Sequence, residues 1–242
     1  MILIFALLAG TVYSKNLLFV GDSHTAGYFG QDTHKLLSKS FDNVATFGHS
    51  SSAAIHWVSD KSFKLTGGKF NEFFYMGEKL KDPNPIYWRV PSLVPKFDNV
   101  IANMAYHERW QREIGSRIIP DLVVIALGAN DARSISDENG RINSISYKRR
   151  ALAIESMLDK LEAIGAQCIW IGPPNGIKKS RKNQETLYKY LRSTVGSRCK
   201  FMSSNHYLVN GCDGVHFNCR ALRHKALKWA QEVNNFILNN RN

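Results

Sequence analysis

Short apolar runs recur along the chain, and longer stretches of mixed polarity separate them. The runs span residues 17–20, 44–47, 122–127, 168–171 and 200–203. Most of them are brief and rich in β-branched residues, as expected of strands that are buried on both faces of a parallel sheet. The pattern therefore predicts five buried strands.

Helical periodicity fills several of the intervening stretches. Residues 144–164 place their apolar side chains near a 3.6-residue repeat, which indicates an amphipathic helix. Residues 184–195 and 221–238 have a similar pattern. Strands that alternate with helices predict a doubly wound parallel sheet. The positions expected to face the core are Ile145, Leu152, Ile154, Met157, Leu158 and Leu161 in the first helix, and Leu222, Leu227, Trp229, Val233 and Ile237 in the last.

The segment from residue 57 to about residue 115 interrupts this alternation. It has a Gly-Gly turn, a proline cluster and many aromatic side chains, but no clear periodicity. A long connection inside a compact domain usually has a function, so we expect an elaborated loop that follows the second strand and rises over one end of the sheet. Alternatively, at least half of the aromatic residues fill a small satellite core. These residues are Trp57, Phe63, Phe70, Phe73, Phe74, Tyr75, Tyr87, Trp88 and Trp110, and the prolines are Pro83, Pro85, Pro91 and Pro95.

The N-terminal stretch is apolar and carries no charged side chain. Val12 and Ser14 stand before Lys15 as small residues do at a signal-peptidase site. This pattern predicts a secretion signal over residues 1–14 and a single mature domain over residues 15–242. A buried first strand is the alternative. No stretch reaches the roughly 20 apolar residues of a membrane-spanning helix, so we expect a secreted or periplasmic protein without stable membrane insertion.

The composition is that of a globular protein. Hydrophobic residues make up 44% of the 242 positions and charged residues 21%, which excludes disorder, collagen and coiled coil. The net charge of +12 favours anionic partners, namely nucleic acid, acidic glycans or a membrane surface. We expect no nucleic-acid partner, because no nucleic-acid fold signature is present and export would prevent access. The basic run KKSRK at residues 178–182 is interpreted as a solvated face.

The four cysteines become informative if the chain is exported, because disulfides persist outside the cytosol. Cys212 and Cys219 bracket a short loop, and we favour a bond between them. Cys168 and Cys199 each open a strand-like run, so they lie level and can pair if those strands are parallel neighbours. Four small buried thiols without a bond are the alternative. We expect no zinc site, since no CxxC or histidine pair at ligand spacing accompanies them.

Three short motifs place polar side chains directly after predicted strands. Ser23 follows the first strand in GDSHTAGYFG, on a strand-to-helix turn where a helix N-terminus lowers the cost of negative charge. Asp213 precedes His216 in DGVHF, close enough to orient the imidazole while its other nitrogen takes the Ser23 proton. Asn130 follows a buried strand, and its amide can donate to an oxyanion. Open α/β sheets hold their sites at the carboxyl ends of strands, so we expect these residues to meet.

These motifs carry a family resemblance. GDSH at residues 21–24, GAND at 128–131 and DGVH at 213–216 resemble the first, third and fifth blocks of the SGNH, or GDSL-type, hydrolases, in the same order along the chain. The resemblance spans nearly the whole mature chain. Together with the element pattern it predicts a three-layer α/β/α sandwich with a five-stranded, mostly parallel, flavodoxin-like sheet and a long insertion after the second strand.

The resemblance also implies roles for individual residues. It makes Ser23 the nucleophile, His216 the base and Asp213 the residue that orients the base. The Ser23 amide and Asn130 become oxyanion donors, and Gly48 in TFGHSS is the natural match for a third donor, the glycine amide of the second block. The implied chemistry needs no cofactor and no metal.

Some residues depart from the family pattern or have a structural alternative. His24 stands where the name-giving motif has leucine, and we expect it to alter local packing or to tune the nucleophile's surroundings. It is not expected to act as the base, because adjacent side chains on a tight turn diverge. Asp22 and Asp131 are expected to cap helices or turns. His49 and His56 could line the pocket, but core or surface positions are the better expectation.

The leading functional hypothesis is an exported serine esterase that removes a short acyl group, chiefly acetate, from an envelope polysaccharide or peptidoglycan. A lipid-directed esterase, lysophospholipase or thioesterase is the alternative within the same chemistry. A non-catalytic module that grips an anionic polymer is the alternative from another class, but the intact Ser23, Asp213, His216 and Asn130 argue against loss of catalysis. The sequence leaves the oligomeric state open.

Overall fold

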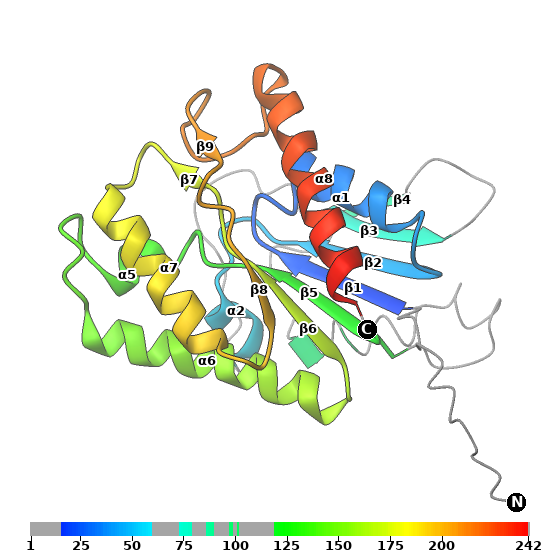
Figure 1. Cartoon of the computed structure of the whole chain (residues 1–242), viewed down its shortest axis with the longest axis horizontal. Coiled ribbons are helices and arrows are strands. Elements are labelled where there is room, and N and C mark those ends of the chain that lie inside the picture. The colour runs from blue at the N-terminus through cyan, green and yellow to red at the C-terminus, as the bar shows by residue number, and fades with distance from the viewer. Residues whose placement is uncertain are drawn as a thin grey trace, which may run out of the picture.

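The computed structural model describes residues 16–59, 73–78, 86–89, 97–98, 101 and 119–241, and for 73–78 and 86–89 it describes the backbone alone. Its centre is a seven-stranded sheet with the strand order β4-β3-β2-β1-β5-β6-β8 (Figure 1). These strands are β1 (Asn16–Gly21), β2 (Asn43–Gly48), β3 (Phe73–Glu78), β4 (Ile86–Arg89), β5 (Leu122–Ala126), β6 (Gln167–Ile171) and β8 (Lys200–Met202). A second, two-stranded sheet pairs β7 (Asn175–Gly176) with β9 (Leu208–Val209).

The five apolar runs form the parallel part of the large sheet. β2, β1, β5, β6 and β8 are neighbours in that order and run parallel to one another. Counted along the chain, this is the order 2-1-3-4-5 of flavodoxin-like sheets, so the predicted fold class is confirmed. The register aligns Gly21 with both Gly48 and Ala126, so the carboxyl ends of β1, β2 and β5 lie level.

Helices cover both faces of the sheet and complete three layers (Figure 1). Leu17 and Phe19 of β1 pack on one side, whereas Leu18 and Val20 pack on the other, as the period-two alternation of a strand requires. The first face holds α1 (Tyr28–Leu37) and α8 (Arg223–Asn240), which follows the 3-10 turn η1 (Arg220–Leu222). The second face holds α2 (Ala54–Val58), α5 (Ala132–Ile135), α6 (Ser144–Ala163) and α7 (Arg181–Val195). None of these described helices is long and apolar enough to cross a membrane.

Three helix residues predicted to face the core are exposed instead. Ile145 is 80% exposed, Leu152 64% and Leu227 41%. The buried stripe of α6 includes Ile154, and at about 100° per residue Ile145 lies about 180° away from it. Leu227 and the buried Trp229 stand two positions apart on α8 and likewise face nearly opposite ways. The other predicted core positions of these two helices are buried.

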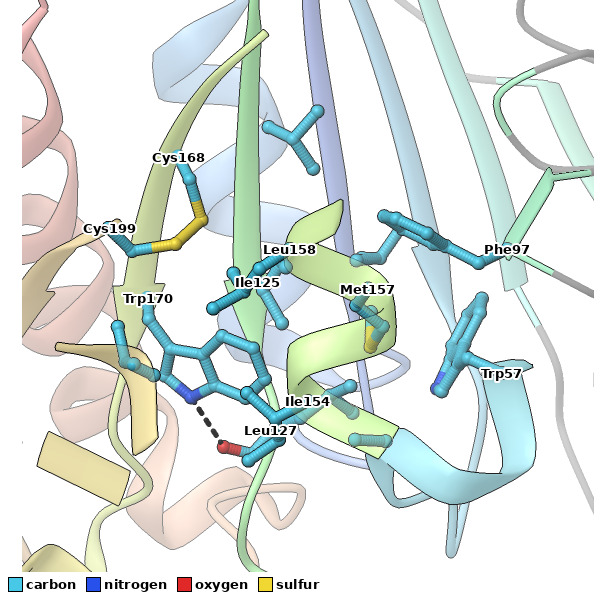
Figure 2. Close-up of a cluster of buried hydrophobic side chains, with 14 of the residues drawn as sticks. Trp57, Phe97, Ile125, Leu127, Ile154, Met157, Leu158, Cys168, Trp170 and Cys199 are labelled. Atoms are coloured by element: carbon cyan, nitrogen blue, oxygen red, sulfur yellow. Dashed lines mark hydrogen bonds between the residues drawn. A yellow bond between two sulfur atoms is a disulfide. The ribbon is translucent and has the colours of Figure 1, made fainter. Parts of the chain in front are cut away.

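The core beneath α6 contains two fully buried tryptophans, Trp57 and Trp170 (Figure 2). The indole Nε1 of Trp170 donates a 3.1 Å hydrogen bond to the carbonyl of Leu127, where β5 passes into its loop. Trp57 belongs to the same cluster as Phe97 and Met157. Trp57 therefore belongs to the main core on this face of the sheet and not to a small satellite core.

Part of the insertion forms strands rather than the predicted loop. β3 and β4 extend the sheet beside β2 in antiparallel orientation, with Phe73 opposite Gly48. The runs FFYMGE and IYWR are rich in aromatic residues, which favour strands, and the prolines flank the second run without entering it. Phe63, Phe70 and Trp110 lie outside the described residues, as does the predicted signal segment 1–14.

Both candidate cysteine pairs are disulfides. Cys168 and Cys199 join the neighbouring parallel strands β6 and β8, with Cα atoms 4.6 Å apart (Figure 2). Cys212 and Cys219 close a short loop before α8, with Cα atoms 6.4 Å apart. The strands β6 and β8 are thus the parallel neighbours that the predicted Cys168–Cys199 pairing required.

Candidate active site

The turn after β1 presents Ser23 at the carboxyl end of the sheet. Asp22 Oδ1 accepts the backbone amide of His24 at 2.9 Å, and the amide of Ala26 donates to the Asp22 carbonyl at 3.0 Å. These bonds fold the segment tightly, and α1 begins only at Tyr28. Ser23 therefore lies on the predicted strand-to-helix turn, with the first turn of α1 several residues further along the chain.

Ser23, His216 and Asp213 form one chain of hydrogen bonds. Ser23 Oγ lies 2.7 Å from His216 Nε2, and His216 Nδ1 lies 2.5 Å from Asp213 Oδ2. The second oxygen of Asp213 accepts the backbone amides of Val215 at 2.9 Å and His216 at 2.8 Å. The structure thus brings together the three residues that the sequence analysis selected from opposite ends of the chain.

Asp213 remains ionised although it is partly buried. Burial raises the pKa of this carboxyl, but hydrogen bonds from the His216 ring and from the His216 and Val215 amides outweigh burial and lower the pKa to about 2. An ionised carboxylate accepts the Nδ1 proton, which leaves Nε2 as the acceptor for the Ser23 hydroxyl. The side chain of His216 is 25% exposed, so solvent and a substrate can reach the pair.

The loop that carries Asp213 and His216 is tightly constrained. Besides the Cys212–Cys219 bond, it has positive φ angles of 57° at Cys212 and 72° at Gly214. A Cβ atom on Gly214 would lie 2.8 Å from the Ile177 side chain. Glycine at this position therefore satisfies both the backbone conformation and the close packing against the segment after β7.

Gly48 lies at the end of β2, level with the end of β1. A Cβ atom here would lie 2.2 Å from the Ala26 nitrogen, so only glycine lets the turn after β1 pack against β2. The next amide, that of His49, donates to the Gly21 carbonyl at 2.9 Å. The structure gives Gly48 a packing role, and its oxyanion role stays a prediction.

Asn130 lies on the loop after β5, in which Gly128 has a φ of 131°. Its side-chain Nδ2 donates to the Ser52 carbonyl at 2.9 Å, and its second hydrogen is left for another acceptor. Asp131 stands at the N-cap of α5 without a side-chain capping bond. Its carboxylate instead pairs with Arg150 of α6, so of the two expected roles, helix cap or turn residue, Asp131 has the second.

His24 packs against His216 from the interior of the protein. Its ring is buried, with its centroid 5.2 Å from that of His216 and 5.5 Å from that of Trp229. Burial, followed by electrostatic interactions with His216 and Lys179, lowers the pKa of His24 well below 6.5, so the ring is neutral at pH 7. Its effect on packing was predicted, but its contact with the base was not.

The rings of His49 and His56 contact nearby backbone groups. The His49 ring is buried, and its Nδ1 lies 3.0 Å from the Ser50 carbonyl. His56 Nδ1 accepts the Ala53 amide at 3.0 Å, at the start of α2. Burial is the main cause of a lowered pKa in both, to about 4 in His56. The buried ring of His49 agrees with the expected core position, and His56 is partly buried at the start of α2.

The sequence analysis missed Lys179. Within the basic run that we predicted to be solvated, Lys178 and Lys182 are exposed, whereas Lys179 is partly buried. Its Nζ donates to the carbonyl of Ala129, directly before the candidate oxyanion donor. All but one of the positions in the run are cationic, so the sequence gives no signal that singles out this lysine.

Sequence comparison relates the chain to one described family. A family described as "Protein of unknown function (DUF459)" matches residues 104–218, slightly less than half of the chain. No curated protein matches the chain in sequence.

Solved structures resemble the chain over most of its length. A carbohydrate acetylesterase from Sinorhizobium meliloti is 14% identical with a TM-score of 0.51, over 93% of this chain and 99% of that one. A family two carbohydrate esterase from Clostridium thermocellum, solved with cellohexaose, is 13% identical with a TM-score of 0.50, over 94% of this chain and 64% of that one. At such low identities the likeness shows a shared fold. The fold implied by the resemblance of the motifs to SGNH-type hydrolases is therefore confirmed.

Proposed function

We propose that the chain is a serine esterase that hydrolyses short-chain esters through Ser23, His216 and Asp213. The observation that carries the proposal is the hydrogen-bonded chain from Ser23 Oγ through His216 to Asp213, with distances of 2.7 and 2.5 Å. A serine hydroxyl is a weak nucleophile alone. An adjacent base that is itself oriented by a carboxylate activates it.

In the proposed reaction, His216 Nε2 takes the hydroxyl proton as Ser23 Oγ attacks the ester carbonyl carbon. The resulting oxyanion accepts hydrogen bonds from the Ser23 amide, the Asn130 side chain and the Gly48 amide. Collapse of this intermediate breaks the bond to the alcohol, which leaves with the proton from Nε2, and an acyl group stays on Ser23. A water molecule activated by His216 then attacks the acyl group, releasing the acid and restoring the serine.

The proposed substrate is an O-acetylated carbohydrate or peptidoglycan of a cell envelope, met by a secreted or periplasmic enzyme. The two solved structures described above, which share the fold, are a carbohydrate acetylesterase and a carbohydrate esterase. Two disulfides are compatible with an oxidising compartment. The net charge of +12 would attract an anionic polymer.

Acetate release from a panel of O-acetylated glycans and peptidoglycan tests this proposal. We expect release by the wild type and by Ser144→Ala, which changes an exposed serine at the start of α6. Ser23→Ala should release acetate at least about 10³-fold more slowly. Equal rates for the two variants would overturn the proposed chemistry.

A series of synthetic esters from acetyl to dodecanoyl tests the acyl group separately. The proposal expects the highest kcat/KM for acetyl. A maximum at long chains, with Ser23→Ala inactive, would keep the mechanism and replace the carbohydrate substrate by a lipid.

A further inference from the structure

Lys179 connects the segment after β7 to the loop after β5. Its Nζ donates to the carbonyl of Ala129, while the exposed Lys178 next to it has no such contact among the described residues. Gln184 of α7 fixes the lysine's backbone, since its Nε2 donates to the carbonyls of Gly176 at 2.8 Å and of Lys179 at 3.0 Å. The ammonium therefore reaches the Ala129 carbonyl from a backbone that is itself anchored.

The charge of Lys179 interacts with two buried carboxylates, those of Asp22 and Asp131, and with the cation of Arg133. Burial lowers the pKa of the ammonium, whereas the charges of Asp22 and Asp131 raise it. Burial raises the pKa of both carboxyls, to about 6 for Asp22, and the lysine charge opposes that rise. Asp22 directly precedes Ser23, and Asp131 directly follows Asn130, so the charge of the lysine acts on both the turn that carries Ser23 and the loop that carries Asn130.

The contact with Ala129 acts on the peptide unit that leads into Asn130. The Ala129 carbonyl and the Asn130 amide nitrogen belong to one planar group, so a donor on this oxygen fixes the orientation of that plane. Asn130 is also restrained by the bond from its Nδ2 to the Ser52 carbonyl at 2.9 Å and by the turn bond from the Asp131 amide to the Gly128 carbonyl at 3.0 Å. Without the lysine, the Ala129 carbonyl would lose its cationic donor, and the peptide could rotate the side chain away from the oxyanion.

We propose that Lys179 is a positioning residue that holds the Asn130 amide where the oxyanion forms. This inference rests on the proposed esterase function. Lys179 acts through Asn130 and touches no reacting atom itself, so its loss affects the transition state more than substrate binding.

Single variants give the first test, with an acetyl ester as substrate. We expect Lys179→Met to lower kcat at least about tenfold while KM stays within about threefold. Lys179→Arg should recover most of kcat, because guanidinium keeps the charge and donates to a carbonyl. Lys178→Met, the matched exposed control, should keep the wild-type kcat, and circular dichroism checks that each variant is folded.

A double-mutant cycle with Asn130→Ala gives the decisive test. Asn130→Ala alone is expected to lower kcat by about 10²- to 10³-fold. Adding Lys179→Met should then lower kcat by less than about twofold, because the group that the lysine positions is already absent. Losses that multiply independently would overturn the inference. If Lys179→Met does not fold, Lys179→Ala, which also removes the donor, replaces it in the cycle.

Ser23→Ala, measured in the same assay, distinguishes a failure of the proposed esterase mechanism from a failure of the inference about Lys179. Full activity in Ser23→Ala would overturn the proposed esterase mechanism together with this inference. An inactive Ser23→Ala beside a Lys179→Met variant that behaves like Lys178→Met would overturn the inference alone.

Discussion

At the scale of single residues, the imidazole of His216 is held from three directions. Asp213 contacts Nδ1, Ser23 contacts Nε2, and the ring of His24 packs beside it with a centroid separation of 5.2 Å. These contacts fix the ring orientation before any substrate arrives. A preoriented base can take the hydroxyl proton without a rearrangement that would raise the barrier.

Replacing His216 by alanine should lower kcat for ester hydrolysis by at least about 10³-fold, because the nucleophile loses its base. Asp213→Asn should also be strongly impaired, since an amide stabilises the wrong tautomer of the ring. His206→Ala is the matched control, as this exposed histidine pairs with Glu232 of α8. Steady-state kinetics on an acetyl ester decides the point, and wild-type kcat in His216→Ala would contradict the assigned role.

At the scale of elements, His34 joins a helix to the sheet. Its Nδ1 lies 2.9 Å from Thr46 Oγ1, which links α1 to β2 inside the core. Burial, with a smaller effect from the charge of Lys35, lowers the pKa of His34 to about 4. The ring is therefore neutral in the folded protein at pH values at which the unfolded chain already binds a proton.

This difference predicts a loss of stability in acid. As the pH falls from 6.5 towards 4, the unfolded chain binds a proton at this position and the folded chain does not. Between pH 7 and pH 4 the wild type should lose up to about 3 kcal/mol more unfolding free energy than His34→Gln. Urea unfolding at both pH values measures this, with the exposed His224→Gln as control. A pH dependence identical in wild type and His34→Gln would refute the linkage.

The two disulfides should have different consequences, because they lie in different elements. Cys168–Cys199 spans 31 positions between β6 and β8, whereas Cys212–Cys219 spans 7 and encloses Asp213 and His216. A cross-link stabilises mainly by restricting the unfolded chain, and more so when the loop is longer. The first bond should therefore matter more for stability, and the second more for catalysis.

Replacing Cys168 and Cys199 together by alanine should lower the unfolding free energy by about 4 kcal/mol and leave kcat close to wild type. Replacing Cys212 and Cys219 together should cost less stability but lower kcat at least about tenfold, because the triad loop is no longer closed. Chemical unfolding and ester kinetics on both double variants measure the two effects. The reverse assignment of the losses would contradict this division.

The elements that could be predicted are those whose burial produces a recognisable pattern of apolar residues in the sequence. The strand at Leu122–Ala126 is apolar throughout because both of its faces are covered, and the triad could be selected because its motifs follow strands whose carboxyl ends meet. β3 and β4 escaped prediction, since glycines and prolines around their aromatic runs resemble loop composition. Ile145 was misplaced because apolar spacing does not determine which side of a helix faces the core. Lys179 was missed because its partial burial depends on a carbonyl 50 positions away.

At the scale of the whole molecule, the net charge of +12 bears on the choice of substrate. Attraction of an anionic polymer over the protein surface is screened by salt, with a Debye length of about 10 Å at 0.1 M and about 3 Å at 1 M. Raising the salt concentration should therefore increase KM for an acetylated anionic glycan. KM for an uncharged acetyl ester should change little. Equal salt dependence of the two KM values would contradict a role for surface charge in binding this substrate.

The central claim is that Ser23 is the nucleophile, and covalent capture tests it most directly. A fluorophosphonate reacts with an activated serine by forming an oxygen–phosphorus bond and releasing fluoride. Trypsin cleavage after Lys15 and Lys35 yields a peptide of residues 16–35 in which Ser23 is the sole serine. We predict one phosphonyl group on this peptide in the wild type, none in Ser23→Ala and much slower labelling in His216→Ala. Full esterase activity with no label on this peptide, or with the label at another serine, would contradict the account.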